Sequence, residues 1–173
     1  TKNRLCVPLN IGYVGAYAKA LYGDEINIHL FKDINLLLER SKSIKPDIVG
    51  LSFYYWNTNL NYYLVKKIRE INYDAIIAFG GPSIDSIKEE QEKLLNRFPE
   101  VDIFIEGEGE LGFSKVVGRV LSQPNKIFDT PIECSFFNQN GEFVKGINTS
   151  FTLPLDNVPS PYLNGSLDEF LLL

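Results

Sequence analysis

Short apolar segments alternate with stretches of helical periodicity over residues 5–121. The apolar segments are residues 5–9, 25–31, 47–52, 75–79 and 102–105, and the helical patterns cover 12–21, 36–44, 60–71, 84–98 and 111–121. Apolar strands that alternate with amphipathic helices of this length are typical of parallel strands covered on both faces. The sequence therefore predicts an α/β protein with a doubly wound, five-stranded parallel sheet of strand order 2-1-3-4-5.

The pattern changes at Pro131. Residues 132–137 and 142–146 are predicted to form a β-hairpin, because Asn140-Gly141 between them favours the positive φ angles of a tight turn. The tail "LPLDNVPSPYLNG" contains too many prolines for a helix or a central strand. We therefore divide the chain into an α/β domain, residues 1–130, and a hairpin with an extended linker, residues 131–173. Since the sequence stops at "FLLL", we expect the linker to lead into a further domain.

Charge and hydropathy narrow the range of partners. The 22 acidic and 17 basic residues give a net charge of −5, which argues against a nucleic-acid partner, because such proteins carry a basic stripe. No apolar run approaches the length of a membrane span, and the amino terminus has no basic-then-apolar signal. We expect a cytoplasmic protein without a membrane partner. Cys6 and Cys134 match no metal-binding or redox spacing, so no metal site is predicted.

Loops rich in glycine, hydroxyl or aromatic residues follow four of the predicted strands. They are residues 10–13, 52–57, 80–83 and 106–110. In an open parallel sheet, ligands bind outside the carboxyl ends of the strands, near the switch in strand order. Glycine allows a ligand close to backbone amides, and aromatic rings offer flat apolar faces. The four loops together predict a site for a large, flat, partly apolar ligand, although any single glycine could serve only a turn.

The aromatic run from Phe53 to Trp56 has two interpretations. Four adjacent rings in a surface loop expose apolar area unless a ligand or another protein covers them. Alternatively, Phe53 and Tyr55 point into the core while Tyr54 and Trp56 face outward.

Two other features carry no catalytic prediction. The run "GEGELG", residues 107–112, matches the letters of a dinucleotide-binding motif, but it follows the fifth predicted strand instead of the first. It also places Glu108 and Glu110 where a pyrophosphate would lie, so we reject this motif. His29 is the only histidine and lies within a predicted strand, without a serine or cysteine partner. We therefore predict no catalytic residue.

Five segments in order resemble a known family. The segments "IGYVGAYAKA", "PDIVGLSFYYWN", "IIAFGGP", "VDIFIEGEGE" and "NVPSPYLNG" are similar to the N-terminal cobalamin-binding domain of cobalamin-dependent radical S-adenosylmethionine enzymes. The resemblance implies a flavodoxin-like domain that holds cobalamin at the carboxyl edge of its sheet. A C-terminal radical S-adenosylmethionine domain in the same chain is the partner that it implies.

The resemblance also implies which loops contact the cofactor. The corrin ring would lie over the loops after the first and third predicted strands, the nucleotide tail would run by residues 80–82, and the loop 106–110 would flank it. The candidate cofactor-binding residues are Asn10, Gly12, Tyr13, Ser52, Tyr54, Tyr55, Trp56, Asn57, Gly80, Gly81, Pro82, Glu106, Gly107, Glu108 and Gly109.

The chain departs from the family's wider pattern in two ways. It has no Cys-x3-Cys-x2-Cys motif, so the iron–sulfur cluster and S-adenosylmethionine would belong to the further domain, and this fragment alone is not expected to be catalytic. It also lacks the Asp-x-His-x-x-Gly loop that supplies a histidine to cobalt, so base-off cobalamin without a protein histidine ligand is expected. Methyl transfer or a related radical reaction is the implied activity of the parent enzyme. A flavin-binding module and a cofactor-free docking domain are the alternatives.

Overall fold

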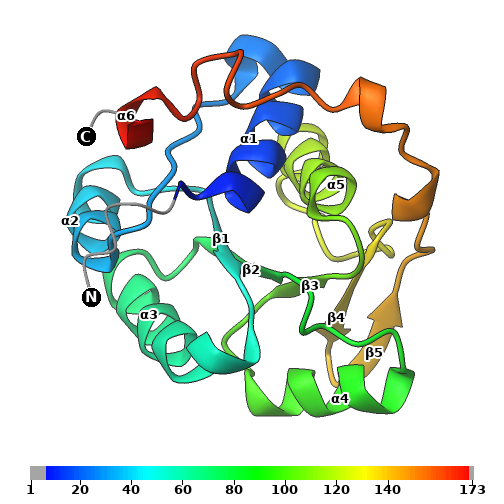
Figure 1. Ribbon diagram of the computed structural model, residues 1–173. Helices are drawn as coiled ribbons and strands as arrows, with labels where there is room; N and C mark the ends of the chain where they lie inside the picture. Colours follow the sequence, from blue (N-terminus) through cyan, green and yellow to red (C-terminus); the bar gives the residue numbers. More distant parts are fainter. Residues whose placement is uncertain (1–6, 172–173) are drawn as a thin grey trace.

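The computed structural model describes residues 7–171, which form a five-stranded sheet between two layers of helices (Figure 1). The helices of four residues or more are α1 (Leu9–Tyr22), α2 (Ile34–Ile44), α3 (Thr58–Ile71), α4 (Lys88–Arg97), α5 (Gly109–Ser122) and α6 (Asp168–Leu171). The strands are β1 (Ile48–Ser52), β2 (Ile76–Gly80), β3 (Ile103–Ile105), β4 (Ser135–Gln139) and β5 (Glu142–Lys145). The predicted α/β class is confirmed.

The sheet order is β1-β2-β3-β4-β5. β1, β2 and β3 are parallel, and they pair as the predicted third, fourth and fifth strands should. The predicted hairpin, β4 and β5, joins the same sheet antiparallel to β3, with Phe104 opposite Phe136. The sheet is therefore mixed, with its parallel part at one side.

The first two predicted strands are not among the strands of this sheet. In the predicted strand 5–9, residues 5 and 6 lie outside the described residues, and Leu9 is already the first residue of α1. Residues 25–31 form no strand, and β1 is hydrogen-bonded only to β2 among the described strands. The alternation in 25–31 has another cause, because a Cβ on Gly15 of α1 would lie 3.3 Å from both Ile28 and Leu30. The strand order 2-1-3-4-5 is not confirmed.

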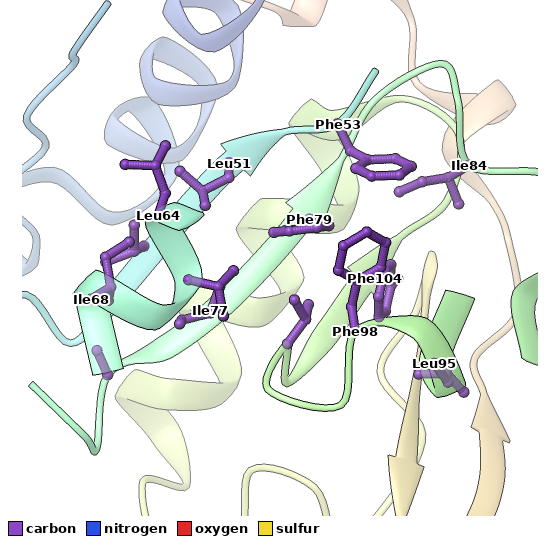
Figure 2. Close-up of a cluster of buried hydrophobic side chains, with 14 of the residues drawn as sticks. Leu51, Phe53, Leu64, Ile68, Ile77, Phe79, Ile84, Leu95, Phe98 and Phe104 are labelled. Atoms are coloured by element: carbon purple, nitrogen blue, oxygen red, sulfur yellow. The ribbon is translucent and has the colours of Figure 1, made fainter. Parts of the chain in front are cut away.

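Apolar side chains fill both faces of the sheet. On the face of α3 and α4, Phe53 stacks on Phe79 with ring centroids 5.3 Å apart and meets Phe98 edge-on at 5.6 Å (Figure 2). On the other face, Ile103 and Ile105 pack under α5. Phe53 is buried, as one interpretation of the aromatic run had it, but Tyr55 is exposed and not in the core.

The segment after β5 crosses the outside of the α1 and α5 layer before it reaches α6 (Figure 1). It is anchored by Leu167, which is fully buried. Within residues 7–171, no helix combines the length and hydropathy that crossing a membrane requires.

Candidate functional site

A cavity of about 1300 Å³ opens at the carboxyl ends of the parallel strands. It continues along the free edge of β1, between that strand and residues 25–34, as far as Lys45 and Asp47. The predicted site residues that line it are Asn10, Tyr13, Ser52, Tyr54, Asn57, Gly80, Gly81, Pro82, Gly107, Glu108 and Gly109. Residues from all four predicted loops therefore meet at one place, although residues 10–13 form the first turn of α1 and not a loop.

The remaining predicted residues lie elsewhere. Gly12 is buried on α1, where a Cβ would lie 3.0 Å from the Cδ2 of Leu167. Glu106 turns its carboxylate into the protein, 2.8 Å from the ammonium group of Lys145 on β5. Tyr55 and Trp56 do not line the cavity and project into solvent, 74% and 80% exposed.

The exposed aromatic residues nevertheless have a defined arrangement. Trp56 stacks on Tyr54 with ring centroids 4.4 Å apart and an interplanar angle of 19°. The Nδ2 of Asn10, on α1, donates to the Tyr54 hydroxyl at 2.7 Å. A flat apolar surface thus stands beside the mouth of the cavity.

The backbone beneath these rings is fixed by hydrogen bonds. The amide of Phe53 donates to the carbonyl of Gly80 at 2.7 Å, which joins the ends of β1 and β2. The amide of Tyr54 donates to the Asn57 Oδ1 at 2.9 Å, and that of Tyr55 donates to the Ser83 hydroxyl at 3.1 Å. Each amide from Phe53 to Tyr55 therefore has a partner before any ligand is bound.

Backbone conformation and packing require some glycines of the site but not others. Gly81 has φ +145°, and a Cβ there would lie 2.5 Å from the Phe53 carbonyl oxygen. Gly107 has φ +75° and lies against the Ser150 side chain. Gly80 has no such constraint, because its Cβ would meet Ile105 at an ordinary contact distance of 3.5 Å. Backbone conformation and packing thus require Gly81 and Gly107, whereas neither requires a glycine at position 80.

Carboxylates occupy the start of α5 at the same edge. Burial raises the pKa of Glu110, and the nearby charge of Glu108 raises it further. A phosphate would meet two carboxylates here, which agrees with the rejection of a dinucleotide site.

His29 lies on the far wall of the cavity, in the segment that is not a strand. Its ring is exposed and faces that of Phe31, with centroids 6.5 Å apart. Residues 7–171 contain no cluster of three or more histidine, cysteine, aspartate or glutamate side chains that could hold a metal.

Asn61 is among the cavity-lining residues that sequence reasoning missed. The predicted apolar stripe of the third helix began at Leu60, but Leu60 is 39% exposed and Asn61 is buried in its place. The signal was present, because Asn61 lies three and four residues before the buried Leu64 and Val65.

Comparison with known proteins identifies the family. The family model described as B12 binding domain matches residues 4–117. The cobalamin-dependent radical SAM methyltransferase TokK of Streptomyces tokunonensis is 27% identical over 125 residues, which cover 72% of this chain and 18% of that protein. The 2-(S-pantetheinyl)-carbapenam-3-carboxylate methyltransferase of Streptantibioticus cattleyicolor is 27% identical over 124 residues, 71% of this chain and 17% of that protein.

A solved structure shares the fold. The apo form of the cobalamin-dependent S-adenosylmethionine radical enzyme OxsB aligns with a TM-score of 0.57 and 21% identity, over 92% of this chain and 22% of that one. The chain spans about a fifth of the length of each of these proteins.

Proposed function

Because the chain belongs to the B12-binding domain family, we propose that it holds cobalamin at the carboxyl edge of β1, β2 and β3, where the loops after these strands meet the first turn of α1. The corrin ring lies over the aromatic loop and Tyr13, with amide contacts from Asn10 and Asn57. The nucleotide tail runs past Gly80 and Pro82, and the loop 106–110 flanks it.

One observation carries this assignment: the exposed ring of Trp56, stacked on the half-buried Tyr54, stands beside a cavity with amide groups at its mouth. Trp56 and Tyr54 form the flat surface, and Asn10, Asn57 and the backbone at Gly80 supply polar contacts. A corrin has a broad apolar face and a rim of amide side chains, so it needs both kinds of contact. The residues present fit cobalamin.

The lower face of cobalt is proposed to have no ligand from this domain. His29 lies in residues 25–31, outside the aromatic loop, and its exposed ring faces that of Phe31. Lysine is cationic at neutral pH and must lose a proton before it coordinates a metal. We therefore expect base-off cobalamin, with the cofactor's own base held near Gly80.

The parent protein is proposed to be a cobalamin-dependent radical S-adenosylmethionine enzyme. Bound cobalamin supplies a cobalt centre that can carry a methyl group. The names of TokK and of the carbapenam methyltransferase support methyl transfer as the reaction class. Residues 131–173 would then connect this domain to a radical domain that carries the iron–sulfur cluster and S-adenosylmethionine.

Retention of hydroxocobalamin tests the cofactor. The protein is incubated with hydroxocobalamin, desalted and scanned, and we expect corrin absorbance to remain with it. Trp56→Ala should lose most of this absorbance, whereas Tyr73→Ala, which removes another 80% exposed aromatic ring, should retain it. A parallel incubation with flavin mononucleotide should leave no flavin bands. Retained flavin, or no retained ligand at all, would favour one of the two alternatives and reject this proposal.

A further inference from the structure

Asn61 is a polar residue in the buried stripe of α3, one helical turn after Thr58. This stripe also contains Leu64, Val65 and Ile68, and Asn61 is only 3% exposed. An amide side chain in such a position is unfavourable unless its polar atoms are hydrogen-bonded. Its partners therefore indicate why an asparagine is there.

The partners of the Asn61 amide nitrogen lie at the end of β1 and in the loop that follows it. The Nδ2 donates to the Ser52 carbonyl at 3.0 Å and to the Asn57 Oδ1 at 3.2 Å. The Asn57 Nδ2 donates to the same Ser52 carbonyl at 2.8 Å. Two amide groups thus fix the carbonyl at which the strand ends.

This network continues to the aromatic pair. The Asn57 Oδ1 that Asn61 contacts also accepts the amide of Tyr54. Tyr54 in turn stacks on Trp56. The chain of contacts from Asn61 through Asn57 and Tyr54 thus links a buried side chain to the exposed ring of Trp56.

A ring that is 80% exposed gains little packing energy, so the fold by itself has little need to order the loop that carries it. A ligand, in contrast, binds more tightly to such a loop, because a loop that is already ordered loses less conformational entropy on binding. We propose that Asn61 is a positioning residue that holds the aromatic loop ready for the corrin ring. This inference rests on the proposed cobalamin site.

The test compares Asn61→Asp with the parent protein. Aspartate has nearly the same shape but lacks the two N–H donors and places carboxylate oxygens near the Ser52 carbonyl. Near-ultraviolet circular dichroism reports the Tyr54–Trp56 stack, and a hydroxocobalamin titration reports affinity. We expect a weakened aromatic signal and about ten-fold weaker binding, the effect of losing roughly one hydrogen bond's contribution.

Two controls separate positioning from stability. Asn59→Asp makes the same chemical change at an exposed position of α3 and should alter neither signal. Leu95→Ala opens the core on α4 and should lower the melting temperature without changing either signal below the transition. If Asn61→Asp does not fold, Asn61→Ala removes the donors without adding a charge.

An Asn61 variant with the parent's circular dichroism and affinity would overturn the inference. If the parent itself does not bind hydroxocobalamin, the proposed function fails. The circular dichroism comparison would still decide whether Asn61 holds the loop.

Discussion

Leu167, in the segment after β5, packs directly over Gly12 of α1. Leu167 is fully buried, and a Cβ on Gly12 would lie 3.0 Å from its Cδ2. The glycine is thus explained by packing of the tail, although the sequence placed it among the cofactor-binding residues. The contact also fixes the tail to the helix that carries Asn10 and Tyr13.

This contact predicts coupling between two substitutions. Leu167→Ala should lower the free energy of unfolding by roughly 3 kcal/mol, and Gly12→Ala by about 1 kcal/mol through overpacking. In the double variant, the new methyl group occupies part of the space that Leu167 leaves, so the combined loss should be smaller than the sum. Urea unfolding measures all three variants. Strictly additive losses would contradict the direct contact.

Substitutions at Gly80 and Gly81 should have different effects on cofactor binding and on folding stability. Gly81→Ala should destabilise the protein by about 2 kcal/mol or more, because of its positive φ and the approach of its Cβ to the Phe53 carbonyl. Gly80→Ala should leave the free energy of unfolding nearly unchanged but weaken hydroxocobalamin binding, because its methyl group would stand where the cofactor meets the backbone. Denaturant unfolding and a binding titration give both quantities. Normal binding by Gly80→Ala would remove that residue from the site.

Glu110 should make stability depend on pH. Burial, with a smaller effect of Glu108, raises the pKa of Glu110 above its ordinary value of 4.5. The folded protein therefore favours the protonated form, and this contribution is complete below pH 4.5 and is lost as pH rises through the folded-state pKa. Glu110→Gln should raise the melting temperature at neutral pH but not in acid.

The matched control for Glu110 is Glu89→Gln. Glu89 is an exposed carboxylate in the first turn of α4, where it interacts favourably with the helix dipole. Its replacement should lower the melting temperature slightly at neutral pH. The same response from both variants would show that burial does not govern Glu110.

The lower face of cobalt can be examined by electron paramagnetic resonance. For the bound cob(II)alamin form, we expect no superhyperfine splitting from an axial nitrogen, and His29→Ala should leave the spectrum unchanged. Splitting that disappears in His29→Ala would identify the histidine as a ligand. Splitting that persists would show that the cofactor's own base remains attached.

The parallel strands were predictable because burial on both faces leaves a continuous apolar run in each. The segment 75–79, for example, corresponds to β2, in which Ile76 to Phe79 are all buried. The strand predicted for residues 25–31 does not form, because alternating apolar residues show only that one side of a segment is covered. Here that side faces α1 and not a sheet. The family was also predictable from the sequence, and the match of residues 4–117 to the B12 binding domain confirms it for four of the five segments.

The site was predictable at the level of loops but not of individual side chains. Carboxyl ends of parallel strands meet at one edge, so Ser52 and Gly81 were brought together by topology alone, whereas Tyr13 reaches the site from α1. The direction of Glu106 depends on Lys145, which the hairpin delivers from far along the chain. The sequence around Glu106 therefore does not indicate this partner.

Fluorescence of Trp56 during a hydroxocobalamin titration tests the central claim most directly. Trp56 is the only tryptophan of the chain and belongs to the stacked pair at the proposed corrin site. After correction for absorbance with free tryptophan, we expect saturable quenching with the same midpoint as the retention of corrin by the protein. Retained corrin with unchanged Trp56 fluorescence would show that cobalamin binds elsewhere, and would contradict the site proposed at the aromatic loop.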